Sequence, residues 1–138
     1  MPKPVILCVD DEPVVLDSLK IQLKNAFRDT YGYEMAESSD EAWEILEELS
    51  EDNTNVVVIV SDWLMPGMKG DEFLIKVHQK FPKVLKIMLT GQADMEAIQQ
   101  AIEQANLYRC LSKPWNSEEL IATIQSGLKN YQHYQDYE

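Results

Sequence analysis

The chain has 138 residues, of which 24 are Asp or Glu and 12 are Lys or Arg, so its formal net charge is −12. This length accommodates one compact domain with its own core and is too short for two. The negative charge repels nucleic acid and anionic membranes, and no apolar run approaches the ~18 residues of a membrane-spanning helix, so we expect direct contact with neither and no signal peptide.

In chain order, short apolar runs alternate with stretches of helical periodicity. Val5–Val9 is continuously apolar, which predicts a strand buried on both faces. Pro13 then begins a helix, at a position where its missing N–H costs nothing. Tyr33–Ala36 is a weaker second strand, and either Ser39 or Asp40 is expected to cap the second helix.

The second half of the chain repeats this alternation. Val56–Val60 consists of five β-branched residues and predicts a third strand. A loop and a third helix follow, and this helix runs to about Phe81, because Pro82 disfavours its continuation. Leu85–Leu89 and Arg109–Ser112 are the fourth and fifth strands.

Two further helices complete the pattern. Met95, Ile98 and Ile102 repeat at helical spacing, and Ser117 begins a last amphipathic stretch. Five strands alternating with five helices predict an α/β fold with a parallel sheet covered on both faces. A single domain of this size suits the flavodoxin-like doubly wound order 2-1-3-4-5, in which ligands bind outside the carboxyl ends of the strands.

The same strand order separates the two cysteines. Cys8 and Cys110 would lie on the first and fifth strands, roughly 14 Å apart and beyond disulfide reach. Each sits in an apolar run, where a reduced thiol behaves as a small apolar side chain. We therefore expect a reduced, cytoplasmic setting.

Polar residues suited to phosphoryl chemistry follow four of the predicted strands. Asp10 and Asp11 follow the first strand, Asp62 the third, Thr90 ends the fourth and Lys113 follows the fifth. Each residue alone is an ordinary cap, turn or surface residue. Their joint placement at one sheet edge is what indicates a site.

The chemistry of this set can be derived from its charges. Two carboxylates about 5 Å apart repel by roughly 3 kcal/mol at an effective dielectric near 20, so three of them call for a cation. Ligands that are all oxygen favour Mg²⁺. Asp62 beside such a cation could accept a phosphoryl group, with Lys113 and the cation neutralising its oxygens and Thr90 donating a hydroxyl.

Four segments resemble the signature blocks of bacterial receiver domains, the chemotaxis-regulator-like modules of two-component signalling. The resemblance extends from Val5 to about Leu128, in the order and spacing of that family. The segments are Val-Asp-Asp-Glu at 9–12, Ser-Asp-Trp-Leu-Met-Pro-Gly-Met-Lys-Gly at 61–70, Leu-Thr-Gly at 89–91 and Leu-Ser-Lys-Pro-Trp at 111–115.

The resemblance implies a phosphoacceptor and a metal site. Asp62 would take the phosphoryl group. Asp11, Asp62 and the backbone carbonyl of Leu64 would bind Mg²⁺ directly, and Asp10 would assist through water. In that family the domain catalyses only its own phosphorylation and dephosphorylation, so we expect a signalling protein rather than an enzyme.

The resemblance also implies a switch, with one departure. Thr90 and Lys113 would contact the phosphoryl group, and the Lys113–Pro114 peptide bond would be cis. Cys110 stands where the family normally has an aromatic switch residue. Tyr108, placed by strand alternation on the same face as Cys110, is one substitute for that ring, and simple packing of both side chains is the other interpretation.

Partners and domain limits follow from the resemblance as well. Residues 1–128 would form the receiver domain, and residues 129–138 a helical extension, either a frayed end or a connector to an output domain. The phosphoryl group would come from a sensor histidine kinase or a histidine phosphotransfer protein. Output would be controlled through the fourth helix, fifth strand and fifth helix, and homodimerisation is an alternative use of the chain.

Three other functions compete with a working receiver. Hydrolases of the haloacid dehalogenase type also use an Asp nucleophile and Mg²⁺, but they resemble Asp-x-Asp, and the second position here is Leu64, which cannot transfer a proton. A flavodoxin-type cofactor binder is opposed by the acidic cluster. A degenerate receiver is opposed by the complete set of three Asp residues, Thr90 and Lys113.

Overall fold

Five parallel strands form one sheet in the order β2-β1-β3-β4-β5, which confirms the predicted flavodoxin-like fold. The computed structural model describes residues 3–91 and 95–136. The strands are β1 (Val5–Val9), β2 (Gly32–Ala36), β3 (Val56–Asp62), β4 (Leu85–Thr90) and β5 (Arg109–Ser112). The helices are α1 (Pro13–Phe27), α2 (Ser39–Glu51), α3 (Gly70–Lys80), α4 (Met95–Ala105) and α5 (Ser117–Asp136), with a 3₁₀ turn η1 (Arg28–Thr30) after α1.

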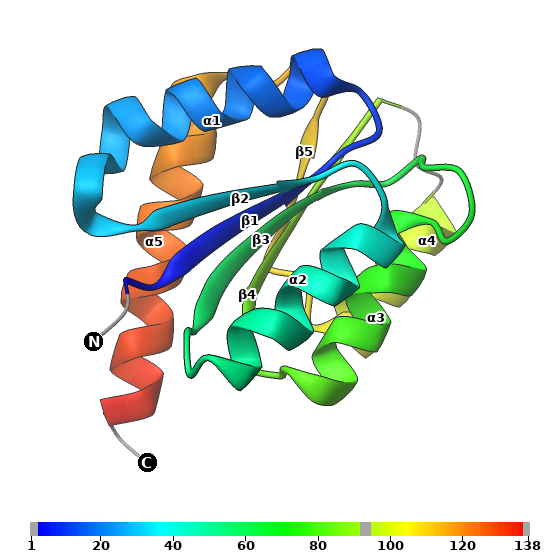
Figure 1. The fold of residues 1–138 in the computed structure, drawn as a ribbon. Coiled ribbons are helices and arrows are strands. Elements are labelled where there is room, and N and C mark those ends of the chain that lie inside the picture. The colour runs from blue at the N-terminus through cyan, green and yellow to red at the C-terminus, as the bar shows by residue number, and fades with distance from the viewer. Residues whose placement is uncertain (1–2, 92–94, 137–138) are drawn as a thin grey trace.

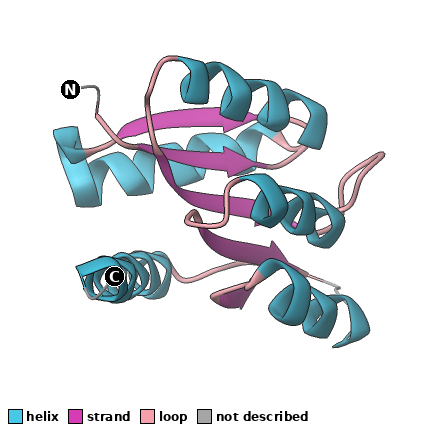
Figure 2. Cartoon of the chain, turned by 90° about the horizontal axis from the view of Figure 1, so that it is seen from below, coloured by secondary structure: helices cyan, strands magenta, loops and turns pink. Residues whose placement is uncertain are grey.

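The sheet is covered on both faces, with α1 and α5 on one side and α2, α3 and α4 on the other (Figure 1). The view along the sheet shows the same three layers (Figure 2). Side chains of β1 and β3 alternate between the faces, as strand geometry requires. Ile6 and Val58 pack toward α1 and α5, whereas Leu7 and Ile59 pack toward the other three helices. The continuous apolar run of β1 is buried throughout, as predicted.

Helix starts follow the local sequence, with one correction. Pro13 begins α1 as predicted. The cap of α2 is Ser38, not Ser39 or Asp40: its hydroxyl accepts from the Glu41 backbone N–H at 3.1 Å, and its backbone is extended as a cap requires. The Ser39 hydroxyl instead donates to the carbonyl of Met68 at 3.0 Å, which links α2 to the loop after β3.

Lys86 on β4 lies entirely inside the protein. Its side chain is 0% exposed, and its Nζ lies 3.0 Å from His78 Nδ1 on α3 and 2.9 Å from the carbonyl of Val84. Burial lowers the pKa of Lys86 to about 8. Burial and the nearby Lys86 charge also lower the pKa of His78. The apolar pattern of β4 gave no sign of this buried pair.

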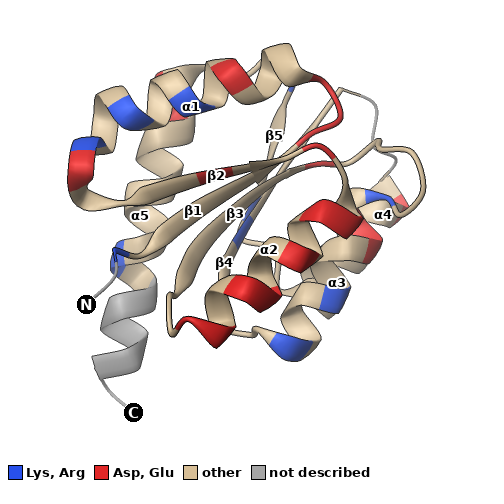
Figure 3. Ribbon diagram, viewed as in Figure 1, with Lys and Arg blue, Asp and Glu red and all other residues tan. Residues whose placement is uncertain are grey.

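Acidic side chains gather along α2, where Figure 3 shows several separate red segments. Trp43 of this helix packs edge-on against Phe81 after α3, and Lys76 lies over the Trp43 ring at 4.2 Å from its centroid. Lys80 of α3 also forms an exposed 3.3 Å ion pair with Glu47. Within residues 3–91 and 95–136, no helix combines the length and apolar character needed to cross a membrane.

Candidate functional site

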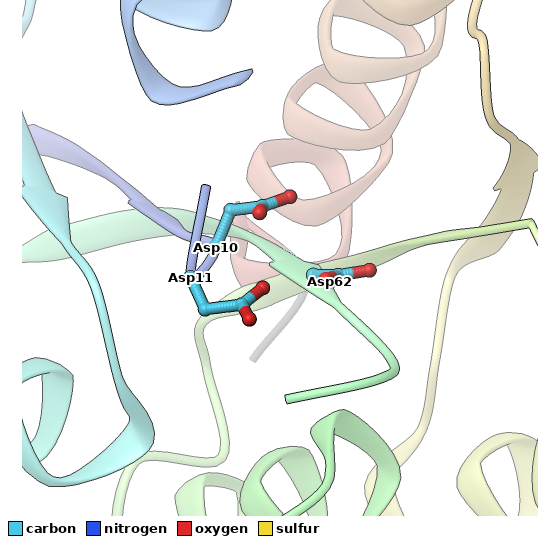
Figure 4. Close-up of side chains that lie close together, drawn as sticks. All are labelled: Asp10, Asp11 and Asp62. Carbon is cyan, nitrogen blue, oxygen red and sulfur yellow. The ribbon is translucent and has the colours of Figure 1, made fainter. Parts of the chain in front are cut away.

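Three carboxylates meet where β1 and β3 end (Figure 4). Asp10 and Asp11 follow β1 directly, and Asp62 is the last residue of β3. One carboxylate oxygen from each residue lies within 4.8 Å of the others. Asp10 and Asp62 are buried and Asp11 is exposed. The structure thus brings together the three acidic residues that the sequence placed at the carboxyl edge.

Lys113 joins this cluster from the end of β5. Its Nζ lies 2.7 Å from Asp10 Oδ2 and 3.1 Å from Asp62 Oδ1, so one ammonium bridges two carboxylates. The backbone N–H of Lys113 donates to the carbonyl of Thr90 at 3.0 Å, which brings the last residue of β4 to the same edge. The Lys113–Pro114 peptide bond is cis, as predicted.

The charges of the site are only partly balanced. The pKa of Asp62 is raised, chiefly by burial; the Lys113 hydrogen bond opposes this rise, and the charges of Asp10 and Asp11 add to it. Burial alone would lower the pKa of Lys113, but its hydrogen bonds to Asp10 and Asp62 outweigh that effect and raise it. One ammonium therefore does not neutralise three carboxylates, and the remaining negative charge favours a further cation.

Asp10 is held in place by bonds to both of its carboxylate oxygens. The Glu12 backbone N–H donates to Oδ1 at 2.9 Å, and Lys113 donates to Oδ2 at 2.7 Å. The Asp10 backbone N–H also donates to the carbonyl of Ala36 at the end of β2. With both oxygens engaged, Asp10 is less available as a direct metal ligand than the exposed Asp11.

The loop between β3 and α3 is fixed by Trp63, the residue after Asp62. The Trp63 indole N–H donates to Asp71 Oδ1 at 3.0 Å, and the Gly70 backbone N–H donates to the Trp63 carbonyl at 2.8 Å. Leu64, whose carbonyl was predicted to bind metal, has an exposed side chain in this loop. Sequence reasoning missed Asp71, because an acidic residue in the first turn of a helix ordinarily indicates only a favourable helix dipole.

Tyr108 does not lie on the same face as Cys110, which corrects the sequence expectation. Cys110 packs with the cluster formed by α2, α3 and α4, whereas Tyr108 packs with the α1 and α5 cluster. Tyr108 precedes β5 by one residue, so strand alternation does not extend to it. Its hydroxyl lies 3.0 Å from Ser126 Oγ on α5, and a Cβ on Gly127 would lie 3.1 Å from the Tyr108 ring.

The comparison with protein families shows which family the chain belongs to. The family model described as the response regulator receiver domain matches residues 6–125. The chain belongs to the response regulator receiver family. This receiver domain resembles, at 30% identity and a TM-score of 0.84, the crystal structure of a CheY-like response regulator receiver domain protein from Methanospirillum hungatei, with 96% of this chain and 98% of that one covered.

Relatives of the receiver domain include longer regulators. The hydrogenase transcriptional regulatory protein HoxA of Cupriavidus necator is 33% identical over 138 residues, which cover 96% of this chain but only 27% of HoxA. The chain thus spans about a quarter of the length of that relative. A solution structure of the beryllofluoride-activated NtrC4 receiver domain dimer matches at 28% identity and a TM-score of 0.78, with 92% of this chain and 98% of that one covered.

Proposed function

We propose that this receiver domain accepts a phosphoryl group on Asp62 in the presence of Mg²⁺ and changes conformation to control an output partner or domain. The observation that carries the proposal is the Lys113 ammonium, which lies between Asp10 and Asp62 in a cluster of three carboxylates. This arrangement supports the proposal because a nucleophile, a positive charge and a set of metal ligands would then lie at one edge of the sheet.

The donor atoms fit a magnesium ion. Asp11 and Asp62 offer carboxylate oxygens that lie close together. The backbone carbonyl of Leu64 would be a third direct ligand, and Asp10 would act through water. Oxygen-only ligands with several coordination positions left for water are typical of Mg²⁺ sites. When bound, the ion would supply positive charge against the cluster and against the phosphoryl oxygens.

The protein's own residues perform the transfer. Asp62 Oδ attacks the phosphorus of a phosphohistidine, forming an O–P bond while the N–P bond breaks and the electron pair returns to the imidazole. Lys113 already lies within 3.1 Å of Asp62 Oδ1, so its ammonium can follow the charge onto the phosphoryl oxygens. Thr90, at the end of the neighbouring β4, would contact another phosphoryl oxygen.

Phosphorylation can be tested directly with a small donor. Incubation with Mg²⁺ and phosphoramidate is expected to add one acid-stable, base-labile phosphoryl group, and mass spectrometry of peptides should place it on Asp62. Asp62→Asn removes the nucleophilic oxygen and should leave the protein unmodified, while Asp71→Asn, on a nearby carboxylate, should still be modified. Equal modification of Asp62→Asn and the wild type would show that another residue is the acceptor.

A second expected outcome concerns Lys113. In Lys113→Ala, Asp10 and Asp62 lose their counter-charge, so the metal-free domain should lose about 1–2 kcal/mol of stability. Mg²⁺ should then stabilise the variant more than the wild type, because the ammonium no longer competes for Asp62. Thermal unfolding with and without Mg²⁺ measures both effects, with the exposed Lys83→Ala as control.

Two variants of Lys113 also distinguish its competition with Mg²⁺ for Asp62 from a role in the conformational change. Lys113→Ala is expected to lose much of the structural response to beryllofluoride, and Lys113→Arg to recover only part of it, since a planar guanidinium places charge differently. An identical Mg²⁺ stabilisation of Lys113→Ala and the wild type would argue against the bridging role.

The proposal extends to partners and domain limits. The donor would be a sensor histidine kinase or a histidine phosphotransfer protein, and α4, β5 and α5 would contact an output domain. The exposed apolar side chains of Met95 (79%) and Ile102 (46%) on α4 support a partner or a second copy there, as does the dimer reported for the NtrC4 receiver. Residues 1–128 would act as the receiver and residues 129–138 as the connector.

We also propose a cytoplasmic location, where sensor kinases present their phosphohistidines. The thiols of Cys8 and Cys110 are both free, which suits a reducing compartment. The net charge of −12 argues against direct nucleic acid contact by this segment, so control of transcription, as in the name of HoxA, would require another domain.

A further inference from the structure

A buried hydrogen bond connects the residue after the phosphoacceptor to the first turn of α3. The Trp63 indole N–H donates to Asp71 Oδ1 at 3.0 Å, and only 8% of Trp63 and 7% of Asp71 are exposed. We propose that Asp71 is a positioning residue for phosphorylation: it holds Trp63, and through Trp63 the backbone that carries Asp62 and the carbonyl of Leu64. This inference rests on the proposed function of Asp62.

The position of Asp71 is one where an apolar residue would pack at lower cost. Its neighbours on the buried side of α3 are Phe73 and Leu74, which belong to the core of that face. Burying a carboxylate costs free energy unless it is hydrogen-bonded, and here the indole N–H and the N-terminal end of the α3 dipole compensate for it. What the carboxylate provides, and an apolar side chain would not, is a fixed direction for the indole.

Three hydrogen bonds hold Trp63, and the one to Asp71 is formed between side chains. The Trp63 backbone N–H donates to the Leu89 carbonyl of β4 at 3.0 Å, and its carbonyl accepts from the Gly70 backbone N–H at 2.8 Å. These backbone bonds fix the position of Trp63, while its ring packs in the core and has Lys69 Nζ 5.2 Å from its centroid. The bond to Asp71 adds a fixed acceptor for the indole N–H and links Trp63, after β3, to the first turn of α3 through side chains.

The bond between Asp71 and Trp63 acts on the two residues that flank Trp63 in the chain. Asp62 precedes Trp63 and Leu64 follows it, so the two direct metal ligands of this loop flank the anchored residue. Partners that orient a ligand without touching the metal commonly contribute about 10- to 100-fold to metal affinity. We therefore expect loss of the Asp71 carboxylate to weaken Mg²⁺ binding about tenfold and to slow phosphorylation of Asp62 by a similar factor.

Two substitutions of Asp71 separate positioning from packing. Asp71→Leu removes the acceptor and fills the space, whereas Asp71→Asn keeps an acceptor oxygen for the indole. In the metal-free protein, Asp71→Leu should make the Trp63 indole N–H exchange with solvent faster by NMR. Amide NMR titration should show Mg²⁺ affinity about tenfold weaker in Asp71→Leu and within about threefold of the wild type in Asp71→Asn, with phosphoramidate rates following the same order.

Trp63→Phe provides an independent variant if Asp71→Leu does not fold. It removes the indole donor and should weaken Mg²⁺ binding to a similar extent, while the double variant with Asp71→Leu should lose little more than either alone. The inference is overturned if a folded Asp71→Leu or Trp63→Phe keeps wild-type Mg²⁺ affinity and phosphorylation rate. If the wild type binds Mg²⁺ but is not phosphorylated, the proposed function fails while the Mg²⁺ and exchange readouts still test Asp71.

Discussion

Replacing Lys86 with Met is expected to make the domain more stable at pH 7 and less stable than the wild type near pH 10. Burial lowers the pKa of Lys86 from 10.5 to about 8. The folded protein therefore binds this proton less readily than the unfolded chain does, which costs stability wherever the amine is charged in both states. At about 1.36 kcal/mol for each pH unit between the two pKa values, the cost is about 3 kcal/mol.

The pH range of this cost follows from the two pKa values. The cost is fully present below pH 8 and disappears as the pH rises toward 10.5, where the unfolded chain also loses the proton. The Lys86→Met substitution would remove the cost but leave the Val84 carbonyl and His78 Nδ1 without their donor, a loss of about 1–2 kcal/mol. The variant should thus gain about 1–2 kcal/mol at pH 7 and lose up to about 1 kcal/mol near pH 10, where part of the cost remains in the wild type.

Urea unfolding of both proteins between pH 7 and pH 10 measures this change. The difference between them is the informative quantity, because burial raises the pKa of Cys8 to about 12 and also raises the pKa of Tyr31 and Tyr33, so both proteins lose stability at high pH. As a control, the pKa of His78 should rise in Lys86→Met, since the nearby charge is gone. A stability difference that does not vary with pH would contradict the destabilisation that we attribute to burial of the charged Lys86 amine.

Gly70→Ala is expected to destabilise the domain by about 3 kcal/mol and to slow phosphorylation about 100-fold. A Cβ at Gly70 would collide with the backbone carbonyl oxygen of Asp62 and lie 2.9 Å from Trp63 Cα. Backbone atoms cannot swing aside as a flexible side chain can, so β3 and α3 must separate. The displaced residue is the proposed phosphoacceptor itself, so stability and rate should fall together.

Gly91→Ala is the matched control for stability. A Cβ at Gly91 would have no neighbour within 4 Å, so its stability should stay within about 0.5 kcal/mol of the wild type. Urea unfolding and phosphoramidate labelling measure the two effects. Wild-type stability together with a wild-type rate in Gly70→Ala would show that the end of β3 can move without harm to the site.

The sequence was sufficient to predict the sheet order and the gathering of Asp10, Asp11 and Asp62, because parallel strands present their carboxyl ends at one edge. It was insufficient where a side chain's partner lies on another element. Asp71 had the appearance of a residue that favours a helix start, and Lys86 that of a single charge within an apolar strand. Only the packing of α3 against β3 and β4 shows that the side chains of Asp71 and Lys86 are buried and hydrogen-bonded.

The prediction that Tyr108 shares a face with Cys110 was wrong for a different reason. Side chains alternate between the faces only inside a strand, and Tyr108 lies one residue before β5. Ser38 illustrates the same limit at a helix: three neighbouring residues, Ser38, Ser39 and Asp40, all have side chains able to cap α2. The Ser39 hydroxyl is used in the hydrogen bond to the Met68 carbonyl, and Ser38 is the residue in the cap position.

The close approach of α5 to Tyr108 and β4 has a mechanical consequence for the last turns of this helix. Gly127 lies inside α5, where a Cβ would be 2.5 Å from Leu85 Cδ2, so the helix rests on β4 and on the Tyr108 ring at this point. From Gly127 to Asp136 the helix continues for roughly 14 Å at 1.5 Å per residue. A tilt of α5 by about 10° at Gly127 would therefore move its end at Asp136 by roughly 2 Å.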